Sequence, residues 1–175
     1  MNASVPVLVV TGTIGVGKTA IAMTMSEILH DRGIRHGLLE VDWLGEVFPA
    51  PYPDDPYSTR FAMKNLAAIW PHYLDVGITR AIVTMTIENQ QELDDLKAAL
   101  PSGEVIVVRL EASPETRAER IKRRELGTLL DHFLAKTGPL AQHMERFEIG
   151  DLVVQNDNQS PQAVANEILR RVGWL

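Results

Sequence analysis

The sequence predicts an α/β protein with one parallel sheet covered by helices on both faces, and two observations carry this prediction. Short apolar segments alternate with helical segments, as in folds built from strand–helix–strand units with right-handed crossovers. The apolar segments are also continuous rather than interleaved with polar residues, which is typical of strands buried on both faces. The expected strands are Val5–Val10, Gly37–Val41, Ala81–Ile87, Val105–Leu110 and Leu152–Val154.

The helical segments between these strands carry start and stop signals. They are expected at Lys18–Arg32, 90–100, 114–125 and 161–172. Gly33 follows the first helix, in the position where a left-handed glycine commonly ends a helix. Asn89 and Glu92 form a capping pair at the start of the second. Ser113 and Ser160 each precede a proline, so that a capping hydroxyl comes before a proline at the first helical position.

Two stretches interrupt this alternation. Pro49–Ser58 contains four prolines and is expected to be a loop, because proline suits neither a helix interior nor a central strand. Gly127–Gly150 is only weakly patterned, and no regular element is predicted there. Both stretches should lie at the carboxyl edge of the sheet, where open α/β folds bind ligands.

Length and composition limit the class of protein. A chain of 175 residues is predicted to form a single domain, residues 1–175. Apolar residues make up 45% and no cysteine is present, which excludes disulfides and thiolate metal sites. No apolar run reaches the roughly 20 residues of a transmembrane helix, so no membrane partner and a cytoplasmic location are expected. The net charge is −6, and without an extended basic face no nucleic-acid partner is expected. A monomer or homodimer is expected.

The most specific motif is Gly12-Thr13-Ile14-Gly15-Val16-Gly17-Lys18-Thr19, followed by Ala20. It matches the phosphate loop G-x-x-x-x-G-K-[ST] and lies between an apolar strand and an amphipathic helix, as this loop requires. Glycines let the backbone bend so that N–H groups surround phosphate oxygens, and the helix dipole adds to this attraction. Lys18 is predicted to reach the β- and γ-phosphates, and the Thr19 hydroxyl to bind Mg²⁺. Residues 12–20 are therefore predicted to bind the nucleotide.

The rest of the chain distinguishes among the proteins that share this loop. The strand Ala81–Ile87 contains no Asp-Glu pair of the kind that holds the metal ion in hydrolytic motors. Residues 155–158 read Gln-Asn-Asp-Asn and lack the lysine of guanine-specific switch proteins. A transporter-type LSGGQ signature is also absent. These absences favour a small kinase.

With this loop and this order of elements, the chain resembles the P-loop small-molecule kinases, in particular adenylylsulfate-kinase-like and chloramphenicol-phosphotransferase-like bacterial proteins. The resemblance covers nearly the whole chain. It implies a three-layer P-loop NTPase fold with a parallel five-stranded sheet in the order 2-3-1-4-5. It further implies a mobile lid at residues 120–145 and ATP with Mg²⁺ as the phosphoryl donor.

Two acidic residues close the second strand, where the sequence reads Leu39-Glu40-Val41-Asp42-Trp43. Strand alternation predicts that Glu40 and Asp42 lie on the same side. By resemblance to the paired acids of shikimate kinase, Asp42 would orient the acceptor hydroxyl and Glu40 would act on Mg²⁺ or its waters. The alternative is that Asp42 caps the next helix. Two roles are also open for Glu88, which is either an acid beside the metal ion or part of the start of the next helix.

A dense basic cluster follows Ser113, at residues 117–124. It is similar to the lid entrance of these kinases, which implies that Arg120 stacks on the adenine and that Arg124 meets the transferred phosphate. The alternative is a solvated helix with internal pairs such as Glu119 with Arg123. Asp157 lies in a polar loop where the relatives surround the adenine, and it is assigned to the nucleotide.

Seven of the aromatic residues lie between Trp43 and Tyr73, in the segment that lines the acceptor site in this fold class. Trp43, Tyr52 and Tyr57 are the candidates for a pocket suited to a flat or partly apolar acceptor. Arg60 is a candidate for an anionic group of that acceptor. Phe61, Leu66, Ile69 and Trp70 have helical spacing and are expected to be the core face of a helix that starts near Ser58.

The leading hypothesis is ATP-dependent phosphoryl transfer to a hydroxyl of a small molecule, with Lys18, Asp42 and Arg124 as catalytic residues. A nucleotide-binding regulator without a dedicated acceptor is the alternative, favoured by the missing aspartate in the third strand. A nucleoside monophosphate kinase is the second alternative. The shortage of arginines between residues 43 and 73 argues against it, because an acceptor that already carries phosphate needs them.

Overall fold

The computed structural model describes residues 4–175 and contains one parallel sheet. Its strands are β1 (Val5–Thr11), β2 (His36–Glu40), β3 (Arg80–Thr84), β4 (Gly103–Glu111) and β5 (Leu152–Gln155). The strand order is β2-β3-β1-β4-β5, and every neighbouring pair is parallel. The predicted fold class and sheet order are confirmed.

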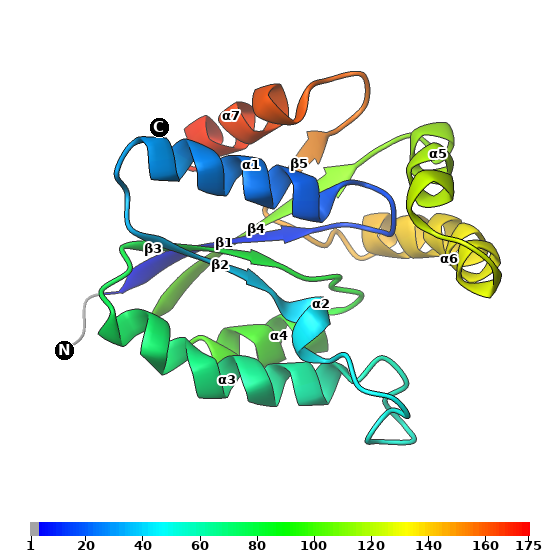
Figure 1. Ribbon diagram of the computed structural model, residues 1–175, viewed down its shortest axis with the longest axis horizontal. Helices are drawn as coiled ribbons and strands as arrows, with labels where there is room; N and C mark the ends of the chain where they lie inside the picture. Colours follow the sequence, from blue (N-terminus) through cyan, green and yellow to red (C-terminus); the bar gives the residue numbers. More distant parts are fainter. Residues whose placement is uncertain (1–3) are drawn as a thin grey trace.

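Helices cover both faces of this sheet. They are α1 (Lys18–Asp31), α2 (Val41–Leu44), α3 (Thr59–Asp75), α4 (Gln90–Ala99), α5 (Pro114–Arg124), α6 (Thr128–Arg146) and α7 (Pro161–Arg171). Figure 1 shows α1 and α7 side by side on one face, with α3 and α4 on the other. Helices α5 and α6 lie beyond the carboxyl ends of the strands, next to the loop that joins β1 to α1 (Figure 1). No helix within residues 4–175 is long and apolar enough to cross a membrane.

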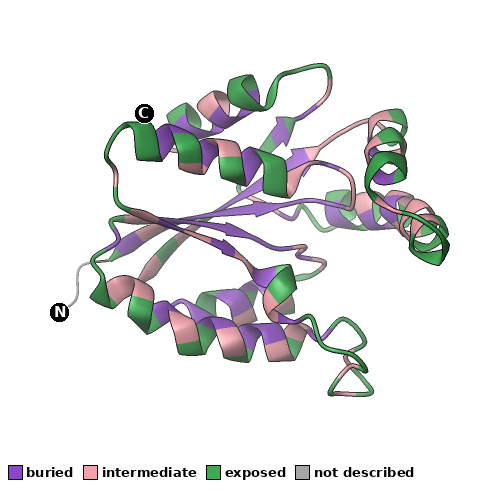
Figure 2. Ribbon diagram, in the orientation of Figure 1, coloured by how far each residue is buried: buried purple, intermediate pink, exposed green. Residues whose placement is uncertain are grey.

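The central strand β1 divides the core into two parts. Val7 and Val9 belong to the cluster that packs against α3, α4 and α6, whereas Leu8 and Val10 belong to the cluster under α1 and α7. This division follows from the pleat, which points successive side chains to opposite faces. All four side chains are buried, and Figure 2 shows the sheet as the most buried layer. The continuous apolar strands are thus explained by burial on both faces.

The predicted helix signals are present. Asn89 accepts the N–H of Glu92 at 3.0 Å, as the capping pair predicted, and the Glu92 carboxylate accepts the N–H of Glu88, the residue before the cap, at 2.7 Å. Ser113 and Ser160 cap α5 and α7. These local bonds satisfy amides that a helix start leaves without partners.

Three sequence predictions about element boundaries are wrong, and one of them is the end of the third strand, because β3 ends at Thr84 rather than at Ile87. Residues 127–150 contain the 19-residue helix α6, which the weak pattern failed to predict. Gly138 and Pro139 lie inside this helix, and both residues have poor helix propensity. The second strand ends at Glu40, and Val41 starts the short helix α2. The argument from strand alternation therefore does not apply to Glu40 and Asp42.

Replacing Asn89 with alanine should lower the free energy of unfolding by about 1 kcal/mol, because the N–H of Glu92 loses its acceptor. Urea denaturation followed by circular dichroism measures this change. Lys97→Ala on the exposed side of the same helix is the matched control and should change stability by less than about 0.5 kcal/mol. Equal unfolding midpoints for the two variants would show that the cap contributes nothing.

Candidate active site

The loop between β1 and α1 is bent through three glycines with positive φ. The φ angles are 139° at Gly12, 85° at Gly15 and 97° at Gly17, which is the N-cap of α1. Residues other than glycine rarely adopt such backbone angles. The loop therefore has the backbone form that the predicted phosphate-binding motif requires.

Space around the loop also demands glycine. A Cβ atom on Gly12 would lie 2.6 Å from the carbonyl oxygen of Leu110 in β4. A Cβ atom on Gly15 would lie 2.8 Å from the carbonyl oxygen of Arg117 in α5. Both distances are too short for a real contact, so the loop is held between the backbones of β4 and α5.

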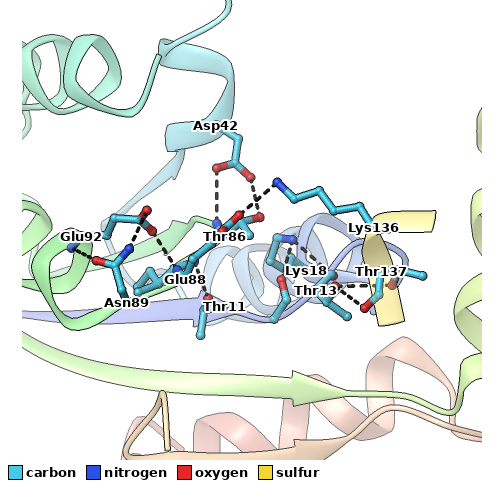
Figure 3. A network of polar contacts seen from close by, with 12 residues as sticks. Thr11, Thr13, Lys18, Asp42, Thr86, Glu88, Asn89, Glu92, Lys136 and Thr137 are labelled. Carbon is cyan, nitrogen blue, oxygen red and sulfur yellow. Dashed lines mark hydrogen bonds and ion pairs between the residues drawn. The ribbon is translucent and has the colours of Figure 1, made fainter. Parts of the chain in front are cut away.

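Lys18 begins α1 and folds back over the loop. Its Nζ donates to the Gly12 carbonyl at 2.9 Å and reaches the Thr13 carbonyl at 3.5 Å, as Figure 3 shows. Burial lowers the pKa of Lys18, and the nearby positive charge of Arg124 lowers it further, while Asp42 and Glu40 oppose this effect. The ammonium group thus lies where both carboxylates influence it.

The side chains of Thr19 in α1 and Glu40 at the end of β2 contact each other at the carboxyl edge of the sheet. The Thr19 hydroxyl donates to Glu40 Oε1, and the Thr84 hydroxyl at the end of β3 donates to the same oxygen at 3.3 Å. Three neighbouring elements, α1, β2 and β3, therefore position one carboxylate. Hydroxyl and carboxylate oxygens are ligands that suit Mg²⁺, so the residues present fit this ion. No cluster of three or more acidic, histidine or cysteine side chains suited to a metal is found in residues 4–175.

Asp42 lies in the first turn of α2 and is exposed. Its carboxylate accepts the Thr86 hydroxyl at 3.2 Å and the Thr86 N–H at 3.3 Å. These bonds run to the segment after β3 rather than to the amides of α2. Thr86 thus fixes the Asp42 carboxylate near the loop, and Asp42 is the largest influence of any charged group on the pKa of Lys18 (Figure 3).

Helix α6 contributes two contacts that the sequence analysis missed. Thr137 donates its hydroxyl to the Ile14 carbonyl at 2.7 Å, and the Thr13 hydroxyl donates to the Thr137 carbonyl at 3.0 Å. Both threonines are buried. These bonds join α6 directly to the phosphate loop (Figure 3). The contacts connect residues more than 120 positions apart, so no local pattern could have indicated them.

Lys136, next to this anchor, lies over the acidic side of the site. Its Nζ is 3.0 Å from Glu88 Oε1 and 3.6 Å from the centre of the Tyr57 ring. Burial alone would lower the pKa of Lys136, but its contacts with Glu88 and Tyr57 raise it above the usual value. Lys136 thus brings α6, the segment after β3 and the proline-rich loop together, and the sequence analysis missed this residue as well.

Arg120 bridges the phosphate loop and the end of β5. Its guanidinium donates to the Val16 carbonyl at 2.9 Å and to the Asn156 carbonyl at 2.8 Å, and the Asn156 amide donates to Val16 at 2.6 Å. Arg124 is exposed and contacts Glu125 at 2.5 Å. The two predicted arginines therefore differ in setting, because only Arg120 is bonded to the loop.

Asp157 is hydrogen-bonded to the residue that caps the start of α5. Its carboxylate accepts the Ser113 N–H and the Ser113 hydroxyl at 2.9 Å each. Hydrogen bonds from Thr116 and Ser113 hold the pKa of Asp157 below its usual value. Asp157 therefore ties the β5–α7 loop to α5. The alternative pair proposed for the basic cluster, Glu119 with Arg123, is present at 3.8 Å and exposed.

The aromatic segment divides as its spacing predicted except at Phe61, which is only partly buried and lies outside the core cluster. Leu66 and Trp70 of α3 are buried in the core, and Ile69 packs against it. Trp43 and Tyr57 are largely exposed. Arg60 contacts Asp54 and lies 4.5 Å from the centre of the Tyr52 ring, so its charge is already matched.

No protein-family model matches the chain, and no curated protein matches it in sequence. Solved structures share its fold along nearly the whole length. The APS kinase of Mycobacterium tuberculosis, in complex with AMPPNP and APS, is 18% identical with a TM-score of 0.67, over 97% of this chain and 98% of that chain. The Deinococcus radiodurans tunicamycin resistance protein is 19% identical with a TM-score of 0.65, over 97% and 96%. A gluconokinase from Sinorhizobium meliloti 1021 is 20% identical with a TM-score of 0.63, over 99% and 94%.

These likenesses define the class of fold, which is the three-layer P-loop fold of small-molecule kinases. The resemblance drawn from the phosphate loop and the order of elements is confirmed at this level. Identities of 18–20% establish the fold and leave the reaction to be argued from the chain's own residues.

Gly15→Ala should abolish nucleotide binding in a protein that still folds, because the added methyl group would meet the Arg117 carbonyl and a φ of 85° disfavours alanine. Calorimetric titration with ATP and Mg²⁺ measures the binding, and circular dichroism checks the fold. Gly138→Ala is the matched control, since a Cβ there meets nothing within 4 Å and Gly138 lies in a helix. It should bind nucleotide normally. Unchanged affinity in Gly15→Ala would contradict the assigned role of the loop.

Proposed function

We propose that this protein is an ATP-dependent phosphotransferase that acts on a hydroxyl group of a small molecule. One observation carries the proposal: at the carboxyl edge of the sheet, Glu40 bonds to Thr19, the neighbour of Lys18, and Thr86 holds Asp42 where its charge also acts on Lys18. A phosphate-binding loop, a metal-side acid and a second, exposed acid are the groups that phosphoryl transfer requires.

The loop would hold the triphosphate through its main-chain N–H groups and the positive end of α1. Lys18 now bonds to the loop's own carbonyl oxygens. A β- or γ-phosphate oxygen is a stronger acceptor because it is charged. We therefore expect the ammonium to exchange these carbonyls for phosphate when nucleotide binds. Arg120 lies beside the same loop, where its planar group would cover the adenine.

The Thr19 hydroxyl and the Glu40 carboxylate would hold Mg²⁺. When bound, the ion would neutralise charge on the phosphates. The Thr84 hydroxyl keeps Glu40 in place from the neighbouring strand. This arrangement needs no aspartate at the end of the third strand, because β2 supplies the acid instead.

Asp42 would orient the acceptor. The acceptor oxygen attacks the γ-phosphorus, the bond from that phosphorus to the β–γ bridging oxygen breaks, and ADP leaves. The hydroxyl proton passes to the Asp42 carboxylate. Because this reaction needs little covalent assistance, the main task of Asp42 is alignment of the hydroxyl. Its two bonds to Thr86 suit that task by fixing the carboxylate.

The predicted lid, residues 120–145, would cover the site from the other side, where Thr137 already bonds to the loop and Lys136 to Glu88. It carries Arg124, whose charge already acts on Lys18 and would stabilise the transferred phosphoryl group. Trp43 and Tyr57 offer exposed aromatic surface next to Asp42 and Lys136. An acceptor with a flat or partly apolar body fits these surroundings.

Lys18→Ala should abolish phosphoryl transfer and weaken nucleotide binding, because the β- and γ-phosphates lose their cationic partner. Calorimetric titration with ATP and Mg²⁺ gives the affinity, and ADP release in the presence of a library of hydroxyl-bearing metabolites gives the activity. An unchanged affinity for ATP would contradict the proposed phosphate site.

Asp42→Asn should lower acceptor-dependent ADP release by about 10²- to 10⁴-fold while ATP affinity stays close to that of the wild type. The amide keeps the shape but cannot take the proton. Asp31→Asn, at the far end of α1, is the matched control and should leave both quantities unchanged. Full activity in Asp42→Asn would remove this mechanism. Binding of ATP by the wild type without turnover on any acceptor would favour a regulator instead.

A further inference from the structure

A cavity of about 340 Å³ lies behind the phosphate loop. Its walls come from the loop, from the ends of β4 and β5, and from α5 and α6. The loop contributes Thr13 and Val16, and α6 contributes Ala141 and Met144. The lining thus combines apolar and polar groups, as sites for small organic ligands do. Of the residues assigned to the nucleotide from the sequence, Thr13, Val16 and Asp157 border this space. The positions proposed for the triphosphate and the acceptor lie in front of the loop and leave the cavity free.

Two buried arginines face this cavity. Arg109 of β4 and Arg117 of α5 are each only 7% exposed and line it. The Nε–H groups of both side chains are buried and have no hydrogen-bond partner among residues 4–175. Arg109 pairs with Glu111 at 3.0 Å, whereas no carboxylate in residues 4–175 pairs with Arg117.

The acids around the cavity do not balance Arg117. Glu111 is shared between Arg109 and the Gln155 amide. Asp157 accepts its bonds from Ser113. Glu145 lines the cavity but is exposed to solvent. A buried guanidinium without a partner is costly, since its loss of hydration is not compensated. Arg117 thus has a charge and a donor available for a group that enters the cavity.

We propose that this cavity binds a small organic anion, with its carboxylate or phosphate group on Arg117 and its carbon body against Val16 and Met144. A guanidinium offers a planar set of N–H donors that matches these groups. The site is separate from that of the triphosphate, which would lie along the loop amides and Lys18. The two sites share the loop itself, because Gly15 packs on the Arg117 backbone.

The arginine Nε–H signals in nitrogen-15 NMR spectra test the proposal directly, because the Nε–H of Arg117 is a donor available to the anion. Protein labelled with ¹⁵N-arginine and saturated with ADP and Mg²⁺, so that the phosphate loop is occupied, is titrated with citrate and separately with inorganic phosphate. The signal of Arg117, identified by its absence in Arg117→Lys, should move with saturation by at least one of the two anions. A signal that neither anion moves would overturn the proposal.

Two further variants separate binding from structure. Arg117→Met should bind the anion about tenfold or more weakly, by the loss of a charge-assisted hydrogen bond. It should also melt at the same or a higher temperature, because an unpaired buried charge is removed. Arg123→Gln, exposed on the same helix, is the matched control and should keep wild-type affinity. Equal anion affinity in Arg117→Met and the wild type would show that the anion binds elsewhere and would end the proposal.

Discussion

The course of the main chain through Gly12, Gly15 and Gly17 is the constraint on which the rest of the site depends. Each of these glycines has a positive φ, and the first two leave no room for a Cβ atom against β4 and α5. Close packing at these two points is possible only with glycine. The same packing fixes where α1 begins, and with it the positions of Lys18 and Thr19. Adding one methyl group at Gly12 or Gly15 would therefore displace every group proposed to contact a phosphate.

Charge organises the space in front of this loop. Lys18 is buried, and burial opposes its charge, but the carboxylates of Asp42 and Glu40 support it. A threonine hydroxyl holds each carboxylate. Thr86 donates to Asp42, and Thr84 donates to Glu40. This arrangement orients the polar groups before a ligand binds, which lowers the reorganisation that catalysis requires. The acids come from β2 and α2, so the absence of an aspartate at the end of β3 leaves the acidic side of the site intact.

The sequence predicted the parts of the structure that local chemistry determines. The loop from Gly12 to Thr19 and the caps at Asn89 and Ser113 follow from short motifs, and the parallel sheet follows from the alternation of elements. The strand order was implied by the resemblance to the P-loop small-molecule kinases. Helix α6 was missed because Gly138 and Pro139 weaken its pattern, and its contacts through Thr137 join distant parts of the chain. The side-by-side placement of Glu40 and Asp42 was argued from strand alternation, which does not apply because β2 ends at Glu40. Arg117 received no role of its own within the basic cluster 117–124, because a run of charges carries no signal for which member is buried.

Charged or polar groups lie on both sides of the loop. The loop's own residues do not give these groups the charged partners that they could bind. On one side the Lys18 ammonium bonds to carbonyl oxygens, which are weaker partners for it than phosphate. On the other side Arg117 is buried without a carboxylate, and Thr13 bonds to α6 through Thr137. A helix anchored to the loop in this way cannot move without affecting the loop's backbone. An anion behind the loop and a triphosphate in front of it would then act on the same few peptide groups, so any effect of one on the affinity of the other must be reciprocal.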